Sequence, residues 1–321
     1  MRRLAAPLLV GASLLAAAGA EDTGDRDVLP LRFAFSARMF TGVNENDAKA
    51  SVKAWALALA RERNVRMSTE AVILSGRAQL TQALREASID GAAVTADEYL
   101  SLEPDLQGTN LFLTQIGGEY TEEYLLLVRG DSGITNPDGL RGRKLIWFDN
   151  SRASLAPLWL DLILAEQNLG APADHFSQML AQQKLVKVVA PVFFRQADAC
   201  LVTRRGFDTM SEMNPQIRTQ LRVLATSPKL VPTLGFIRRG YNSPLRDALF
   251  AALRGLEKSA AGAQVLTLFQ SDQLHQAPVE LLNTARELVK AHRGLSRGTN
   301  RVQSLTAEPG VGLVEYQGAA H

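Results

Sequence analysis

The sequence predicts an α/β protein of two lobes, each built on a mostly parallel sheet flanked by helices, with two crossings of the chain between the lobes. Two observations lead to this prediction. Short β-rich segments alternate with longer segments of helical periodicity, which is typical of parallel sheets covered by helices. The chain also has 321 residues, which is more than one hydrophobic core usually supports, so two lobes are expected.

The first twenty residues have the features of a signal peptide. Arg2 and Arg3 give a positive start, residues 4–15 are mostly apolar, and small residues at 18–20 provide a cleavage site after Ala20. The apolar segment is too short to span a bilayer of roughly 30 Å as a helix. We therefore expect an exported protein that does not span a membrane after cleavage of the signal.

The first lobe is predicted from two stretches of the chain, residues 29–116 and 229–292. The first stretch opens with a β-α-β-α-β unit, in which Val52, Trp55 and Leu59 share one face of the first helix. The expected elements are strands at 31–37, 72–74, 91–95 and 111–114 and helices at 48–63 and 78–87, then a returning strand at 231–238 and helices at 244–257, 262–269 and 279–290.

The second lobe is predicted to be residues 117–228, because Ile116-Gly117-Gly118 is a suitable place for the chain to leave the first lobe. Its expected elements are strands at 123–128, 144–148, 186–189, 199–203 and 221–225 and a helix at 154–168 that ends before Gly170. Residues 293–321 have no sustained period, and we expect a C-terminal tail there.

The charge of the chain and its missing motifs exclude several function classes. Of the 35 basic residues, Arg2 and Arg3 lie in the leader, which leaves 33 against 33 acidic residues. A net charge near zero argues against nucleic acid as a partner, because nucleic acid is usually bound by a large basic excess. The four histidines form no recognisable hydrolase or metal motif, and no nucleotide-binding loop occurs. We therefore expect neither an enzyme nor a metal or other cofactor.

Four short segments, each at a strand or at the start of a helix, follow one known pattern. They are Ser88-Ile89-Asp90-Gly91-Ala92-Ala93 with Tyr99, Leu127-Val128-Arg129-Gly130-Asp131-Ser132-Gly133-Ile134 with Gly139-Leu140-Arg141-Gly142-Arg143-Lys144, Asp149-Asn150-Ser151-Arg152-Ala153-Ser154, and Ala197-Asp198-Ala199-Cys200. In order and spacing they resemble the phosphate, phosphite and phosphonate solute-binding proteins of ABC importers. The resemblance implies a type II periplasmic-binding fold, a periplasmic location, and a small anionic ligand held between the lobes.

The strongest candidate for the ligand site is the loop formed by Asn150, Ser151, Arg152, Ala153 and Ser154. It opens a predicted helix, and a helix start offers unpaired N–H groups and a partial positive charge to an anion. The serines would add hydroxyl donors and Arg152 a fork of charged donors. On the alternative interpretation, the serines only cap the helix and Arg152 is a solvated surface charge. Arg152 and Ala153 also interrupt the run of hydroxyl residues typical of the family's anion loop.

Further ligand-binding residues are expected where other strands end, because ligands of such proteins lie at the carboxyl ends of the strands. Phe40 and Tyr99 would form walls of the cleft, or else pack locally. Asp208 would receive a ligand amine, pair with Arg204, or simply stabilise a helix start. The residues predicted in this way are Ser36, Arg38, Met39, Phe40, Thr95, Tyr99, Thr203, Arg204 and Asp208.

The sequence therefore predicts a periplasmic solute-binding protein, expected to be a monomer, that captures a phosphonate, phosphite or phosphate-like anion for an ABC permease. The alternative is a sensory module of the same fold that acts on a membrane receptor kinase or cyclase. Both would use the same cleft, so the sequence leaves them open.

Overall fold

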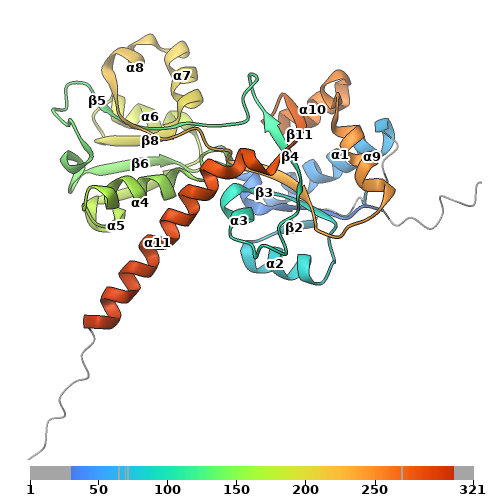
Figure 1. The fold of residues 1–321 in the computed structure, drawn as a ribbon. Coiled ribbons are helices and arrows are strands. Elements are labelled where there is room, and N and C mark those ends of the chain that lie inside the picture. Colours follow the sequence, from blue (N-terminus) through green and yellow to red (C-terminus); the bar gives the residue numbers. More distant parts are fainter. Residues whose placement is uncertain (1–29, 64–65, 69, 71, 269, 307–321) are drawn as a thin grey trace, which may run out of the picture.

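The computed structural model describes residues 30–63, 66–68, 70, 72–268 and 270–306. The predicted signal peptide, residues 1–20, lies outside the described residues, as do residues 307–321 of the predicted tail. Two mixed sheets, each flanked by helices, form two lobes that lie side by side (Figure 1). This confirms the predicted two-lobe α/β architecture, but both sheets are mixed rather than mostly parallel, because β10, β11 and β5 each pair antiparallel with their neighbours.

Six described strands form the sheet of lobe 1, in the order β11-β4-β10-β3-β1-β2. β1 is parallel to β2 and β3, while β10 is antiparallel to both β3 and β4. The carboxyl ends of β1 to β4 and the start of β10 therefore lie at one edge of the sheet. The strands are β1 (Phe33–Ser36), β2 (Val72–Leu74), β3 (Gly91–Thr95), β4 (Asn110–Gln115), β10 (Thr233–Ile237) and β11 (Gln273–Ala277).

Helices cover both faces of this sheet. An aromatic-rich core that includes Phe33, Phe35, Trp55 and Phe112 fills the space between the sheet and α1, α9 and α10. The helices are η1 (Ala37–Phe40), α1 (Glu45–Arg63), α2 (Arg77–Arg85), α3 (Ala96–Leu100), α9 (Pro244–Leu253), η4 (Leu256–Lys258), α10 (Ala260–Leu268), η5 (Val279–Leu282) and α11 (Asn283–Thr306).

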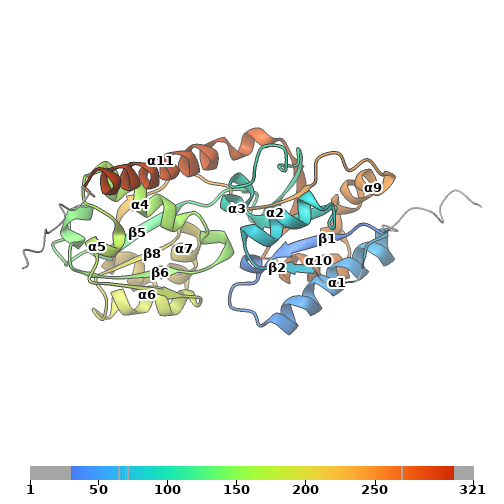
Figure 2. The ribbon, with the colours of Figure 1, turned by 90° about the horizontal axis from the view of Figure 1, so that it is seen from below.

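Lobe 2 contains a described five-stranded sheet in the order β7-β6-β8-β5-β9. Figure 2 shows this lobe with its flanking helices. Its strands are β5 (Tyr124–Arg129), β6 (Lys144–Phe148), β7 (Gln178–Gln182), β8 (Ala199–Thr203) and β9 (Leu221–Thr226). Its helices are η2 (Pro137–Leu140), η3 (Ser151–Ala153), α4 (Ala156–Glu166), α5 (Pro172–His175), α6 (Leu185–Phe193), α7 (Arg204–Met213) and α8 (Pro215–Gln220).

The structure differs from the elements expected from the sequence at four places. The strand expected at 186–189 lies in helix α6, because Val188, Val189 and Val192 are buried on one helical face. Strands β7 and β11 were not predicted, because both are short edge strands rich in polar residues and neither contains a long apolar run. Helix α11 continues to Thr306, so the segment 293–306 of the predicted tail is helical.

The chain passes between the lobes twice within the described residues, once between β4 and β5 and once between β9 and β10. These two segments are called the first and second crossings, residues 116–123 and 227–232. Helix α11 adds a further contact, because it packs against α3 of lobe 1 and α4 of lobe 2 (Figure 1). His292 on α11 lies 2.6 Å from the Asp161 carboxylate of α4, and Arg293 donates to the Leu100 carbonyl at the end of α3.

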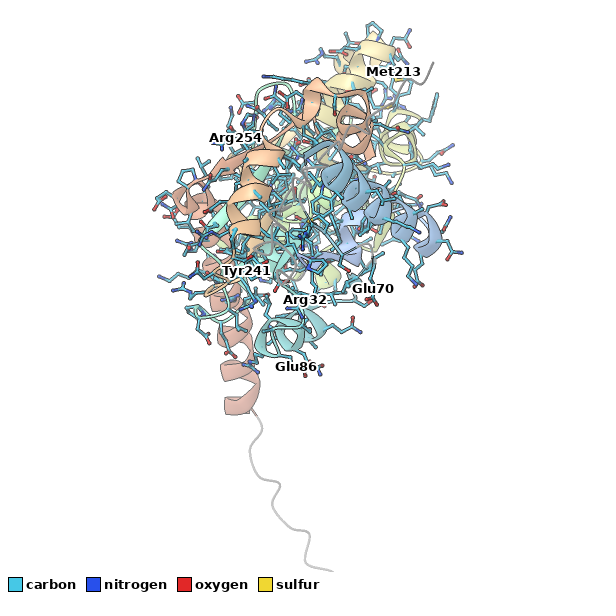
Figure 3. All side chains as sticks on the ribbon, turned by 90° about the vertical axis from the view of Figure 1, so that its right-hand side faces the viewer. Arg32, Glu70, Glu86, Met213, Tyr241 and Arg254 are labelled. Carbon is cyan, nitrogen blue, oxygen red and sulfur yellow. The ribbon has the colours of Figure 1, made fainter. Side chains whose placement is uncertain are left out.

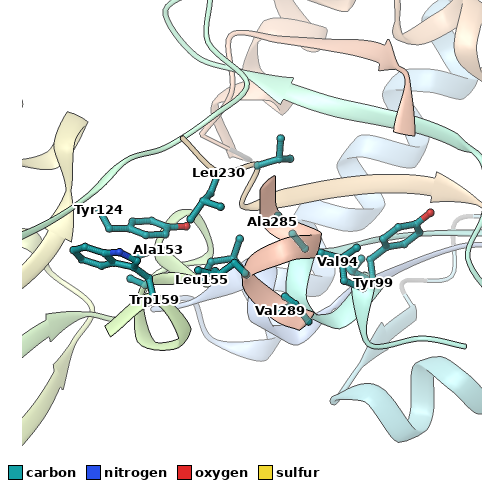
Figure 4. Packing of buried hydrophobic residues seen from close by; sticks show 14 of the residues in the cluster. Val94, Tyr99, Tyr124, Ala153, Leu155, Trp159, Leu230, Ala285 and Val289 are labelled. Atoms are coloured by element: carbon teal, nitrogen blue, oxygen red, sulfur yellow. The ribbon is translucent and has the colours of Figure 1, made fainter. Parts of the chain in front are cut away.

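A hydrophobic core continues across the junction of the lobes. Val94 and Tyr99 of lobe 1, Tyr124 and Trp159 of lobe 2, and Val289 of α11 belong to one buried cluster (Figure 4). The lobes in this structure are therefore packed against each other.

The opposite end of lobe 1 is held by polar contacts. Arg32 donates from its backbone and from its guanidinium to the buried carboxylate of Asp90. Arg238 lies 3.7 Å from the same carboxylate. Figure 3 views lobe 1 from this end, away from lobe 2, with Arg32 and Tyr241 in front. Asp90 thus ties strand ends together at a distance from the junction of the lobes.

Gly235 in β10 offers a test of this packing. A Cβ atom at this position would come within 2.0 Å of the Phe112 ring, which crosses directly over the glycine. We expect Gly235→Ala to lower the free energy of unfolding by about 1–3 kcal/mol, because the packed ring must be displaced. Urea denaturation measures this change.

The control is Gly294→Ala on α11, where nothing lies within 4 Å of the new Cβ atom. Alanine is favoured over glycine in a helix, so this variant should be as stable as the wild type or gain up to about 1 kcal/mol. Equal stability of the two variants would contradict the close approach at Gly235.

Candidate functional site

Four buried hydroxyl side chains line the edge of the lobe 1 sheet at its junction with lobe 2. Strand β1 ends at Ser36 and β3 ends at Thr95. Thr114 is the last residue but one of β4, and Thr233 is the first residue of the antiparallel β10. All four are at most 9% exposed. We call them the hydroxyl row. Because buried hydroxyl groups require hydrogen-bond partners, each of these four side chains must meet a polar group at this edge.

The guanidinium of Arg152 reaches the hydroxyl row from lobe 2. Its Nη1 donates to Thr114 Oγ1 at 2.8 Å, and its Nε and Nη2 donate to Glu122 Oε1 at 3.0 and 2.8 Å. Glu122 lies in the first crossing, and both charged side chains are less than 10% exposed. This ion pair therefore connects lobe 2, the first crossing and lobe 1.

Arg205 is a second, more exposed neighbour of Glu122. Its Nε lies 3.5 Å from Glu122 Oε1, and its Nη2 donates to the Ile116 carbonyl at 3.0 Å. The side chain of Arg205 is 39% exposed. Glu122 thus lies between a buried cation and one that solvent reaches.

The other half of the hydroxyl row surrounds Glu98. Ser36 donates from Oγ to Glu98 Oε1 at 2.7 Å, and Thr95 donates from its amide and its hydroxyl to Oε2 at 3.0 and 2.8 Å. These bonds also cap the start of α3. Ser36 and Thr95, both predicted as ligand-binding residues, therefore donate in this structure to a carboxylate of the chain itself.

The predicted anion loop at 150–154 is packed inside the protein rather than open to a cleft. Asn150 caps η3 by accepting from the Arg152 amide, and Ala153 is fully buried. Ser154 donates to the Pro232 carbonyl of the second crossing at 3.0 Å. Only Asn150 and Ser151 of this loop are partly exposed. In the conformation described, Arg152, Ala153 and Ser154 of this loop are therefore covered by protein.

The start of α4 is also covered. The Tyr124 hydroxyl donates to the Arg152 carbonyl at 3.3 Å, and Tyr124 has no exposed surface. Burial raises the pKa of this phenol far above its ordinary value, with a further contribution from Glu122. The phenol and its ring occupy the space next to the helix start that a bound anion was expected to use.

Tyr99 and Phe40 both pack within lobe 1. The Tyr99 hydroxyl donates to the Gly108 carbonyl at 2.5 Å, and its ring packs on Phe236 within lobe 1. Burial raises the pKa of the Tyr99 phenol. Phe40 is 8% exposed and packs on Phe35. For both residues the alternative of local packing describes the structure.

Thr203, Arg204 and Asp208 lie at the start of α7. Thr203 caps this helix by accepting from the Gly206 amide at 3.1 Å. Arg204 pairs with Glu123, and Asp208 accepts from Arg218 at 2.6 Å. Arg204 and Asp208 line a groove of about 530 Å³ between α7 and the crossings. Acidic side chains outnumber basic ones in this groove, so it does not favour an anion.

A second space, of about 320 Å³, lies between the lobes, and α11 forms part of its wall. We call it the interlobe pocket. Its basic side chains are Arg38, Arg77 and Arg293, with His292 beside them, and its acidic ones are Asp97 and Glu98. Arg38 pairs with Asp97, whereas Arg77 has no hydrogen-bond or ion-pair partner among the described residues. Of the predicted ligand residues, Arg38 thus lines an open space between the lobes.

Four residues of the hydrogen-bonded network around the hydroxyl row and Arg152 were not among the predicted site residues: Glu98, Thr114, Glu122 and Thr233. The spacing of Thr95 and Glu98 is that of a capping box and was readable from the sequence. Glu122 carries no such signal, because its partner Arg152 lies 30 residues away. Pairing across that distance is set by the fold.

Two negative findings apply to the described residues. Their His, Cys, Asp and Glu side chains form no group of three or more that would hold a metal ion. None of the described helices combines the length and apolar character that a membrane span requires.

One comparison with known proteins identifies the family, and another identifies the fold. Residues 39–280 match the model of the family described as ABC transporter, phosphonate, periplasmic substrate-binding protein. No curated protein sequence matches the chain.

Solved structures with the same fold include three bacterial proteins. XAC2383 from Xanthomonas citri, bound to ATP, is 17% identical with a TM-score of 0.61, and the match covers 83% of this chain and 98% of that one. A binding protein component of an ABC phosphonate transporter from Pseudomonas aeruginosa is 16% identical with a TM-score of 0.56, covering 87% and 99%. PhnD1 from Prochlorococcus marinus, in complex with methylphosphonate, is 13% identical with a TM-score of 0.56, covering 83% and 98%.

The buried ion pair makes a testable prediction. Glu122→Gln leaves the guanidinium of Arg152 without a buried counter-charge, so we expect the free energy of unfolding to fall by about 3–5 kcal/mol. Glu123→Gln is the matched control, because Glu123 pairs with the half-exposed Arg204 and should cost about 0–1 kcal/mol. Chemical denaturation of the two variants measures both changes in the free energy of unfolding. Similar losses of stability in the two variants would contradict the greater importance of the buried ion pair between Glu122 and Arg152.

Proposed function

Because the chain belongs to the family of phosphonate ABC transporter periplasmic substrate-binding proteins, we propose that it captures a small oxyanion between its lobes and delivers it to an ABC permease. The observation that carries this proposal is the placement of Arg152 opposite the hydroxyl row. The family consists of transport proteins, which favours a permease over a receptor kinase or cyclase as partner. Export by the N-terminal signal, a monomeric state and the lack of catalytic activity are parts of the same proposal.

The chemistry of the junction suits an oxyanion. A guanidinium presents a planar fork of charged donors that matches two oxygens of a phosphonate, and hydroxyl groups supply further donors. At this edge of lobe 1 the donors are already in place, and two carboxylates of the chain, Glu98 and Glu122, accept from them. The chain therefore holds its donor groups in a conformation that a negatively charged oxygen group stabilises.

Ligand entry requires an exchange of partners at Arg152. When the lobes separate about the two crossings, Thr114 and Arg152 come apart and the guanidinium becomes accessible. An oxyanion then replaces Glu122 on Arg152, and Glu122 retains Arg205, which already lies 3.5 Å away. The displaced carboxylate keeps a counter-charge, so the exchange avoids leaving a buried charge unpaired.

The interlobe pocket contributes attraction for an anion. Arg38, Arg77 and Arg293 line it, and a local excess of positive charge raises the concentration of anions near a site even in a protein of low net charge. This contribution acts over a distance and weakens as salt is added.

Isothermal titration of the exported chain tests the function. The ligands are phosphate, phosphite, methylphosphonate and 2-aminoethylphosphonate, with glucose as an uncharged reference. We expect saturable binding of at least one of the anions and none of glucose. Absence of binding by all four anions would refute the proposed function.

Variants test the position of the bound anion. Arg152→Lys keeps the charge but loses the fork, so we expect affinity to fall by about 1.5–3 kcal/mol, the range for hydrogen bonds to charged groups. Glu122→Gln should raise affinity, because the anion no longer competes with a carboxylate for Arg152. Arg246→Gln, on the surface of lobe 1 beside Asp247, is the control and should bind as the wild type does.

A different result would place the bound anion away from Arg152. If Arg77→Gln abolished binding while Arg152→Lys and Glu122→Gln left affinity unchanged, the anion would lie in the interlobe pocket and not at Arg152. Circular dichroism of each variant at the titration temperature verifies that it is folded.

A further inference from the structure

We propose that the chain binds reversibly to the surface of an anionic membrane through a strip of basic side chains on helix α11 and the turn that follows β10. The strip consists of Arg239, Arg286, Lys290 and Arg293, and we call it the basic strip. This inference goes beyond the proposed function, because it concerns where the chain resides and not the solute that it carries. It is carried by the spacing, the exposure and the lack of acidic partners of these four side chains.

Three members of the basic strip share one face of α11. Arg286, Lys290 and Arg293 follow one another at intervals of four and three residues, and such residues are neighbours on the surface of a helix. All three side chains are exposed. Leu288 and Val289, on the opposite side of the helix, are buried in the core shared by the lobes. The helix therefore keeps its apolar side in the protein and its basic side toward solvent.

The sequence of α11 is basic over its whole length. Residues 283–306 contain five Lys or Arg residues and one acidic residue, Glu287. Arg297 and Arg301 follow Arg293 in the sequence at intervals of four residues. A local field of this kind acts on nearby anions even though the exported chain as a whole is close to neutral.

No member of the basic strip pairs with a carboxylate within the part of the chain that the structure describes. There, Arg239 and Arg293 donate to backbone carbonyls, Arg286 donates to the side chain of Asn283, and Lys290 makes no hydrogen bond or ion pair. Exposed arginines elsewhere in the described chain commonly pair with a carboxylate. The positive charge of the strip is therefore not compensated by the protein and is available to an external anion.

Arg239 extends the strip beyond the helix. Burial raises the pKa of the Tyr99 phenol, and the charges of Arg286 and Arg239 both oppose this rise. Because the two guanidinium groups act on the same phenol, they lie near each other although they come from different elements. Arg239 is exposed as well.

The shape of this surface favours a membrane over an acidic peptide. Figure 2 shows α11 along one edge of the molecule, outside the sheets of both lobes. A helix on an outer edge presents its cations in a line, and a layer of mobile anionic headgroups contacts such a line without a shaped site. Peptides are instead usually held in a groove or along the edge of a sheet. Because the apolar side of the helix is buried, we expect electrostatic binding without insertion.

The expected strength follows from the number of cations. Each Lys or Arg near an anionic membrane surface strengthens binding about fivefold. Four such side chains together give an enhancement on the order of several hundredfold. The attraction decays within a Debye length, so it is sensitive to salt and reversible. Such binding would hold the chain near the permease of the proposed function.

Co-sedimentation of the exported chain with lipid vesicles tests this inference. One set of vesicles contains phosphatidylcholine alone, and the other contains phosphatidylcholine mixed with phosphatidylglycerol. We expect binding to the vesicles with phosphatidylglycerol and none to the others. Raising the salt to about 1 M, where the Debye length is about 3 Å, should release the chain.

A double variant tests whether the basic strip is responsible. Arg286→Gln together with Lys290→Gln should weaken binding to the anionic vesicles roughly 25-fold. The matched control also removes one arginine and one lysine, by Arg141→Gln and Lys49→Gln, whose side chains are 57% and 50% exposed on other surfaces. The control should bind the vesicles as the wild type does. Circular dichroism verifies that both proteins are folded.

The possible failures are distinguishable. Equal binding to the two sets of vesicles, or equal losses in the two double variants, would overturn the membrane surface. Binding to polyglutamate without binding to vesicles would assign the strip to an acidic protein and would also overturn it. The vesicle experiment contains no solute, so these results leave the proposed function standing. Both double variants should bind the anions of the proposed function as the wild type does, because the substituted residues lie outside the interlobe pocket and away from Arg152.

Discussion

The buried ion pair between Arg152 and Glu122 is the constraint on which the junction of the lobes depends. It joins η3 of lobe 2 to the first crossing, and through Thr114 it reaches the sheet of lobe 1. Removing two such charges from water costs several kcal/mol per ion, and a well-packed apolar pair is often as stable. Stability alone is therefore a weak explanation for this pair, whereas a guanidinium positioned for a transferable oxyanion explains both its burial and its place between the lobes.

The hydroxyl row is also suited to the proposed anion. Ser36, Thr95 and Thr114 are buried, and each forms a hydrogen bond with a charged side chain. Glu98 accepts the hydrogen bonds from Ser36 and Thr95. Polar groups that are buried and satisfied hold a unique geometry, so the donors are preorganised. A solute that brings its own oxygens meets donors whose positions are already fixed.

Much of the fold was predictable from the sequence, and the resemblance to the solute-binding family is confirmed. The β-α-β-α-β unit of lobe 1 followed from local periodicity, because its strands and helices are buried on regular faces. The strand expected at 186–189 was wrong because a short run of valines fits a strand and a buried helix equally well. At the site, the sequence singled out Arg152 and Ser36 but not the partners that they contact in the structure. Arg152 meets Glu122 only after the crossing folds back, and Tyr99 turns into the core of lobe 1 through a hydrogen bond to Gly108 that no local pattern indicates.

Helix α11 affects how such a protein exchanges its solute. It contacts α3 and α4 at once, through His292 with Asp161 and Arg293 with the Leu100 carbonyl, and its Val289 belongs to the core shared by both lobes. Separation of the lobes must therefore disrupt or slide contacts that lie outside the ligand site. The free energy of those contacts biases the resting population toward the closed state, and a ligand shifts that balance only by its differential affinity for the two states. A shortened α11 would thus alter the rates of solute capture and release without changing any group that touches the solute.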